Sequence, residues 1–410
     1  MSLGEKLGSA LPEIAAFKEA KQKEADQIAS IVNSTEKQLR HRYATKPPFR
    51  RGVHPKDHGC VKATFKVLGD LPPEYRVGIF AQPGREYQAD IRFSNAATLI
   101  TPPDSAFAEG PPETIRHGSR GMAVKLYGVG GVRLVPKDGE DTQDFLMINQ
   151  PVFAFANVAD YKILSEAIEN DDANIKGFRE AMIATKDAKT LERLKRTGFI
   201  LECIASSSMA PPPPPALDPK VPYAFQAPPL SPLDNRYFTA APFLFGEGYV
   251  AKFAARPVAP VSGDLGDAVK KDKDYLRTAL NERLTAADAQ DIEFDFQVQL
   301  RGPESFKSIE AIDTEIENAC TLWPEKYFPF VTLATITIKP QQDINAPERV
   351  AACEALEFSP WHGLVEHRPL GGINRLRRTV YEKSVELRRC PAAGPSEQPE
   401  KAAAAAPAGG

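Results

Sequence analysis

Short runs of alternating apolar and polar residues recur between residues 60 and 338, separated by Gly, Pro and Asp turns. This alternation is typical of strands buried on one face. The predicted strands fall into two groups: Cys60–Leu68, Tyr75–Phe80, Gln88–Ser94, Met122–Tyr127 and Thr142–Ile148, then Tyr249–Ala255, Ile292–Leu300 and Val331–Ile338. Mostly short connections favour an eight-stranded antiparallel β-barrel, which closes and so leaves no free edges. Its interior accepts a ligand if the inward side chains are not all large.

Helical patterns precede, interrupt and follow these strands, so the fold class is α+β. Residues 5–43 are rich in Ala, Glu, Lys and Gln and predict one or two helices with few apolar positions. Such a segment is expected to be an arm on the body or on a partner subunit, which is compatible with a homo-oligomer. Further helices are predicted within Phe155–Ile200 and at Leu265–Ala286, Glu348–Glu357 and Gly371–Arg389.

Proline divides the chain. Residues 206–242 are dominated by Pro, Ala and Ser, and proline excludes helix interiors and central strands. The segment is therefore expected to be an extended crossing or a partly disordered insertion. The predicted organisation is an N-terminal helical arm (1–46), a barrel domain (47–390) with insertions (155–242) and a final helix (371–389), and a disordered Ala/Pro tail (391–410).

Composition narrows the choice of partners and compartment. A net charge of −3 and a pI near 6.2 give no overall attraction to nucleic acid or anionic lipid. No run reaches the roughly 18 apolar residues of a membrane span, and the N-terminus lacks the pattern of a signal peptide. The five cysteines are far apart and never in a Cys-x-x-Cys spacing, so neither a disulfide framework nor a zinc site is indicated. We expect a cytoplasmic protein with reduced thiols.

The segment 377–388 contains the first candidate chemistry. On a helix, Arg377, Tyr381 and Arg388 lie within about 40° of one another around the axis. A guanidinium one turn from a phenol favours the phenolate, and tyrosine is an axial ligand of haem iron in catalases. The alternative is an exposed basic helix that carries one amphipathic Tyr.

Two more stretches contain candidate polar residues. His54 lies in a turn that opens into the first strand, where it can exchange protons; the alternative is an ordinary loop histidine. Arg92 and Ser94 share one face of a strand. If that face is the barrel interior, Arg92 needs an anionic partner, such as a haem propionate. In the opposite orientation, Phe93 lies in the core and both polar side chains face solvent.

Seven short motifs occur in the order and at roughly the spacing of the haem-dependent catalase family. They are Arg51-x-x-His54, Ile91-Arg92-Phe93-Ser94, 120–127 (RGMAVKLY), 149–153 (NQPVF), 323–329 (WPEKYFP), Phe358-Ser359-Pro360 and Arg377-x-x-x-Tyr381. Together they span about residues 47–390. The chain is most similar to the small catalase-related, peroxidase-like group, which lacks the large C-terminal domains of full-size catalases.

The resemblance implies haem b (iron protoporphyrin IX) as cofactor and gives each motif residue a role. His54 would be the distal acid/base with Ser94 beside it, and Tyr381 the axial ligand of the haem iron, held by Arg377. Propionates would pair with Arg51, Arg92 and Arg388. Catalases commonly have two adjacent Asn, the first of them distal, where this chain has Ile148 and Asn149. Asn149 is therefore the candidate for orienting the peroxide, with a register uncertain by one residue.

The implied activity is a catalase or peroxidase that acts on hydrogen peroxide or small organic hydroperoxides through a ferryl intermediate. A second hypothesis is a fatty-acid hydroperoxide lyase or dehydratase of the allene oxide synthase type. In that branch a Thr typically precedes the distal His; here Val53 precedes it, as in catalases. A third hypothesis, a haem-binding protein without turnover, conflicts with the presence of both His54 and Tyr381.

Overall fold

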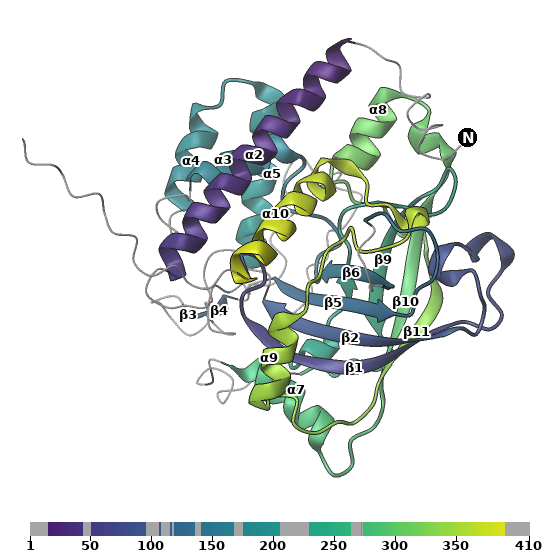
Figure 1. Ribbon diagram of the computed structural model, residues 1–410. Helices are drawn as coiled ribbons and strands as arrows, with labels where there is room; N and C mark the ends of the chain where they lie inside the picture. The colour runs from purple at the N-terminus through teal and green to yellow at the C-terminus, as the bar shows by residue number, and fades with distance from the viewer. Residues whose placement is uncertain are drawn as a thin grey trace, which may run out of the picture.

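The computed structural model describes residues 15–43, 51–95, 106–107, 115–116, 119–135, 141–167, 175–205, 229–263, 272 and 274–389. Eight strands form a closed antiparallel barrel, in the spatial order β10, β11, β1, β2, β5, β6, β7 and β9, with β9 pairing back onto β10 (Figure 1). In chain order they are β1 (Asp57–Val67), β2 (Glu86–Asn95), β5 (Arg120–Tyr127), β6 (Thr142–Ile148), β7 (Tyr237–Phe238), β9 (Val250–Pro257), β10 (Ile292–Arg301) and β11 (Phe330–Ile338). The predicted barrel is confirmed.

Short strands complete the sheet structure. β8 (Phe243–Leu244) pairs with β9 outside the closed ring. β3 (Ala106–Phe107) and β4 (Ile115–Arg116) form a separate two-stranded sheet.

Aromatic side chains fill the barrel interior. The ring centroids of Phe145 and Phe296 lie 4.8 Å apart, and those of Phe65 and Phe296 lie 5.0 Å apart. The ring centroids of Phe253 and Phe145 lie 5.0 Å apart. Phe93 is also part of this core. Because packed side chains occupy this space, the ligand site anticipated inside the barrel is not found there.

One strand prediction is wrong, and one strand was missed. The predicted strand Tyr75–Phe80 forms two 3₁₀ turns, η1 (Pro73–Tyr75) and η2 (Gly78–Phe80). Proline starts the first turn and lacks a ladder donor, and Gly78 has φ +55°, which a strand does not allow. The missing eighth barrel strand is β7, a two-residue strand within the proline-rich segment.

Five of the helices form a group on one side of the barrel. α2 (Ala15–Tyr43) packs against α3 (Val158–Ala167) and α10 (Gly371–Arg389). α4 (Ile175–Ala184) and α5 (Ala188–Ala205) complete this helical group, and α10 lies between it and the barrel (Figure 1).

The remaining helices are shorter. α7 (Tyr275–Thr285) and α9 (Pro347–Ala355) pack against β1, and α8 (Ile309–Ala311) continues into the π-helical turn Ile312–Glu317. No helix in the described ranges is both long enough and apolar enough to span a bilayer. The predicted tail (391–410), residues 206–228 and most of residues 265–274 lie outside the described part of the chain.

The expectation of reduced thiols is wrong for one pair of cysteines. Cys60 on β1 and Cys353 in α9 form a disulfide across 293 residues of sequence. Cys320 is free and buried. The spacing rule failed here because the fold, rather than local sequence, brings Cys60 and Cys353 together.

Candidate functional site

A cavity lies between the outer face of the barrel and α10. Its barrel wall includes the outward-facing residues Ala123 on β5 and Leu146 on β6, whose neighbours Val124 and Phe145 point into the core. Its opposite wall is one face of α10. The lining residues are Arg51, Val53, His54, Arg92, Ser94, Met122, Ala123, Leu146, Met147, Phe358, Tyr381, Ser384, Val385 and Arg388.

His54 is fixed in the cavity wall by β2. Its Nδ1 lies 2.9 Å from Oγ of Ser94, and Nη1 of Arg92 donates a 3.0 Å hydrogen bond to its backbone carbonyl oxygen. The backbone of His54 has φ +55°, a left-handed conformation that is uncommon outside glycine and concentrates at functional sites. These contacts hold the ring in one orientation and leave Nε2 as the ring nitrogen available to a ligand.

The surroundings keep His54 neutral. Burial away from water lowers the pKa of its imidazole to about 3, and the positive charges of Arg92, Arg377 and Arg51 add to the effect. A neutral imidazole has one nitrogen that accepts a proton. The site therefore presents a base rather than a cation at ordinary pH.

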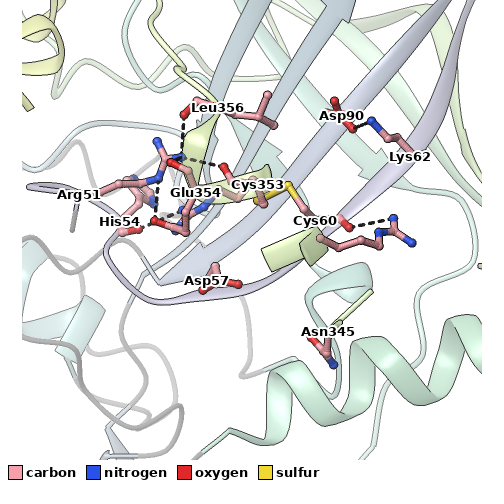
Figure 2. Close-up of a disulfide and its surroundings, with 12 residues drawn as sticks. Arg51, His54, Asp57, Cys60, Lys62, Asp90, Asn345, Cys353, Glu354 and Leu356 are labelled. Atoms are coloured by element: carbon pink, nitrogen blue, oxygen red, sulfur yellow. Dashed lines mark hydrogen bonds and ion pairs between the residues drawn. A yellow bond between two sulfur atoms is a disulfide. The ribbon is translucent and has the colours of Figure 1, made fainter. Parts of the chain in front are cut away.

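Three guanidiniums, of Arg51, Arg92 and Arg388, form a cationic cluster at one edge of the cavity. Nη2 of Arg92 pairs with Oε1 of Glu354 at 3.1 Å, and Nε of Arg51 lies 3.7 Å from Oε2 of the same carboxylate. Figure 2 shows Glu354 beside Arg51 and His54. One carboxylate thus contacts two guanidiniums, and the cluster retains positive charge.

This cluster contains buried donor atoms that make no hydrogen bond to any described residue. Burial lowers the pKa of Arg51 to about 9, helped by the charges of Arg92 and Arg388, and burial also lowers the pKa of Arg388. Among the described residues, Nε of each of the three arginines is buried without a hydrogen-bond partner. Buried unpaired donors cost free energy, so the cluster is suited to a ligand that carries carboxylates.

Tyr381 enters the cavity from α10. The side chains at 381, 384, 385 and 388 recur at helical spacing and form the cavity-facing stripe of α10. The Arg377 guanidinium lies over the Tyr381 ring, 5.6 Å from its centroid, and donates a 3.1 Å hydrogen bond to Oδ1 of Asn374. Asn374 is fully buried and in turn donates to the carbonyl oxygens of Pro242 and Leu370. The phenol is therefore held by a chain of contacts anchored in the core.

The structure brings together every predicted site residue except Asn149. Oδ1 of Asn149 accepts hydrogen bonds from Oγ of Ser119 at 3.1 Å and from the backbone N–H of Arg120 at 2.8 Å, and Asn149 is not part of the cavity lining. Arg377 contacts Tyr381 without lining the cavity itself.

β2 has the second orientation considered from the sequence, but the predicted exposure of its outer face is wrong. Phe93 points into the barrel core, so Arg92 and Ser94 are on the outer face. That face is not exposed to solvent: Arg92 is 2% and Ser94 3% exposed. His54, in the loop before β1, contacts both residues, and Glu354 of α9 pairs with Arg92. The binding face is the outside of the barrel.

Several site residues were not predicted. Glu354 had no local signal, because its partner Arg92 is on a distant strand. Gly121 lies in the 120–127 motif, but the fold sets its close approach to His54 and Ser94. Asn374 precedes Arg377 by about one turn of α10, so helical spacing was a usable signal for it. Ser384 and Val385 follow Tyr381 on the same face of α10, and helical spacing was a usable signal for them.

Searches with family models and among curated protein sequences find no match to the chain. Solved structures do match it. A fungal catalase aligns over 87% of this chain with a TM-score of 0.59 and 16% identity. The chain has the catalase-like fold. A bacterial catalase aligns over 85% of this chain with a TM-score of 0.55 and 14% identity. Catalase A from Saccharomyces cerevisiae aligns over 86% of this chain with a TM-score of 0.57 and 13% identity. The chain spans about three fifths of these proteins: 61%, 59% and 63% of their lengths.

The residues of the cavity fit a haem group. The arginine cluster, whose buried Nε atoms make no hydrogen bond within the described part of the chain, offers donors for carboxylates at one edge. The apolar lining, including Leu146, Met147 and Val385, suits a macrocycle. Tyr381 supplies a phenol oxygen, which haem iron accepts as an axial ligand.

Proposed function

We propose that the chain is a haem-dependent oxidoreductase of the small catalase-related type, which decomposes or reduces hydrogen peroxide or small organic hydroperoxides. One observation carries the proposal: His54 and Tyr381 line the same cavity, one on its barrel wall and one on its helical wall, beside three arginines. A histidine base, a phenol and a cationic cluster around one apolar cavity suit haem peroxide chemistry of the catalase type.

In this proposal, Tyr381 is the axial ligand of haem b and the arginine cluster holds the haem carboxylates. Arg51 and Arg92 are fixed by Glu354, and Arg388 donates to the backbone carbonyl oxygen of Glu354. Asn374 holds Arg377 over the Tyr381 ring, which keeps the phenol pointing into the cavity. Haem supplies the iron centre at which peroxide chemistry occurs.

His54 is the proposed proton carrier. With Nδ1–H donated to Oγ of Ser94, Nε2 has a free lone pair; it takes a proton from a peroxide in the cavity and returns it to the departing oxygen. The pKa of about 3 keeps this nitrogen unprotonated before substrate arrives. Ser94 and Arg92 keep the ring in place during both transfers.

The lyase alternative gains no support from the site. Val53 lines the cavity next to His54 and carries no hydroxyl that could donate to the imidazole. Its presence is compatible with peroxide breakdown by His54.

The proposal is tested by reconstituting wild type and His54→Gln with haem and following hydrogen peroxide consumption together with oxygen release. We expect wild type to consume peroxide and His54→Gln to lose about 10²-fold or more of the rate, because general acid–base catalysis contributes on that order. Unchanged haem content in the variant is the control for the binding site. Equal rates in the two proteins would reject His54 as the proton carrier, and no consumption by haem-loaded wild type would reject the proposed activity.

A further inference from the structure

The carboxyl end of α9 is tied to the barrel at two neighbouring positions. Cys353 forms the disulfide with Cys60, and the adjacent Glu354 pairs with Arg92. Cys60 and Arg92 are themselves partners in the register of β1 and β2. A covalent and an ionic link therefore lie side by side between the same helix end and the same pair of strands. Figure 2 shows Glu354 next to the Cys60–Cys353 disulfide.

The same helix end supplies acceptors to the other two arginines of the cluster. Nη2 of Arg51 donates to the carbonyl oxygens of Cys353 at 3.1 Å and Leu356 at 2.8 Å, and Nη1 of Arg388 donates to that of Glu354. The last carbonyls of a helix carry partial negative charge, and that of Cys353 also accepts a hydrogen bond from the backbone N–H of Leu356 at 3.1 Å. The end of α9 is thus positioned to fix all three guanidiniums.

We propose that the Cys60–Cys353 disulfide is a redox-sensitive latch on the cofactor site. When it is closed, it holds the end of α9, and through it Arg51, Arg92 and Arg388, in the arrangement that binds the haem carboxylates. When it is open, the helix end is tied only by polar contacts and the cluster holds the carboxylates less tightly. The inference rests on the proposed function for the identity of the ligand, and both cysteines act as positioning residues.

The position of α9 depends on few contacts besides the cross-link. The disulfide joins this helix to the first barrel strand, 293 residues away in the sequence. α9 has nine residues and only Cys353 among them is buried. With few apolar contacts of its own, this helix depends on the disulfide and on its ion pairs for its position.

Opening and closing the latch are balanced redox steps. A dithiol reductant attacks one sulfur as a thiolate, and its second thiol then displaces the remaining protein thiolate. Cys60 and Cys353 gain two electrons and two protons, and the reductant leaves as a cyclic disulfide. Hydrogen peroxide reverses the change: two thiols lose two electrons and two protons to form the disulfide, and the O–O bond breaks to give two water molecules. The oxidant that closes the latch belongs to the substrate class proposed for the cavity.

The test measures haem release rather than turnover. Reconstituted protein is mixed with excess apomyoglobin, and the transfer of haem is followed by the change in its main absorption band. The proteins are oxidised wild type, dithiol-reduced wild type with its thiols counted, and Cys60→Ala/Cys353→Ala. Cys320→Ala is the matched control, because Cys320 is a buried cysteine that is free and packs elsewhere, against Val152 and Ala156.

We expect release to be about tenfold faster from reduced wild type and from the double variant, since loss of supporting contacts around a bound group typically costs that much or more. Cys320→Ala is expected to release haem at the wild-type rate and to respond to the dithiol as wild type does. Equal release from oxidised and reduced wild type would overturn the latch.

Haem dimethyl ester, in which both carboxylates are masked, separates the latch from a general loosening of the fold. Because the latch acts through the arginines, release of the ester is expected to be the same from oxidised and reduced protein. Equal acceleration for haem and its ester would overturn the mechanism. If neither form of the protein binds haem, the proposed function itself fails, which is a different outcome from binding that ignores the redox state.

Discussion

Nδ1 of His54 lies 2.9 Å from Oγ of Ser94. Ser94 and Arg92 occupy alternate positions on the outer face of β2, so one strand fixes both the ring and the backbone of His54. This double contact holds the histidine in a left-handed backbone conformation, and it explains how a residue in a turn acquires a defined orientation.

Replacing Ser94 by Ala is expected to lower the rate of peroxide consumption by about tenfold, because the imidazole loses the partner that selects its tautomer. Ser94→Thr retains a hydroxyl at the same position and is expected to recover most of the rate. Haem absorbance in both variants checks that the cofactor site is intact. A Ser94→Ala rate equal to wild type would show that the contact does not position His54.

The expected pH dependence of peroxide consumption follows from the lowered pKa of His54. An imidazole whose pKa is lowered to about 3 stays in its basic form as the pH falls through 6.5, where a free histidine would be half protonated. Peroxide consumption by the haem-loaded protein is therefore expected to stay constant between about pH 5 and pH 8. A loss of half the rate near pH 6.5 would contradict the neutral imidazole inferred here.

Gly121 has no room for a side chain. A Cβ there would lie 2.4 Å from both Cε1 and Nδ1 of His54 and 2.9 Å from Oγ of Ser94. Gly121→Ala is expected to push the imidazole out of position and to lower peroxide consumption by about 10²-fold, at a cost in folding free energy of roughly 1–3 kcal/mol. Activity assays and thermal unfolding of the same samples check both effects. Gly128→Ala is the contrasting glycine variant, because nothing lies within 4 Å of its added Cβ; its φ of +72° strains the backbone only at a distance from the cavity.

The role that the family resemblance implies for Asn149 differs from the contacts that Asn149 makes in the structure. The resemblance assigns it to orienting the peroxide, whereas its Oδ1 serves Ser119 and the backbone of Arg120. Asn149→Ala is expected to lower the free energy of unfolding by about 1–3 kcal/mol, since it leaves buried donors unpaired, and to change peroxide consumption less than threefold. A large loss of rate at unchanged stability would restore the role implied by the resemblance.

The barrel strands were predictable because the pattern that indicates each of them lies within a short stretch of sequence. Alternation in β1 and β2 reflects side chains such as Val61 and Ile91 that point into the core, and a period of two shows this in any short window. The same period placed Arg92 and Ser94 on one face but carried no information about what covers that face. Burial of that face depends on segments outside β2, including Glu354 of α9, which pairs with Arg92.

The parts of the site that escaped prediction depend on long-range contacts. Cys353 and Glu354 sit in a short helix with no unusual motif, and their partners Cys60 and Arg92 are on the first two strands. β7 was missed because two residues are too few to show alternation, and the proline-rich context argues against a strand. The folded structure brings these residues together, and their spacing in the sequence gives no sign of it.

The central claim is that Tyr381 and His54 face a haem held between the barrel and α10, and the most direct test is a pair of absorption spectra. Wild type and Tyr381→Phe are titrated with ferric haem under the same conditions. The account predicts saturation at one haem per chain in wild type, with a ferric tyrosinate-type spectrum that Tyr381→Phe does not show. A wild-type spectrum that the substitution leaves unchanged, or a chain that binds no haem, would contradict it.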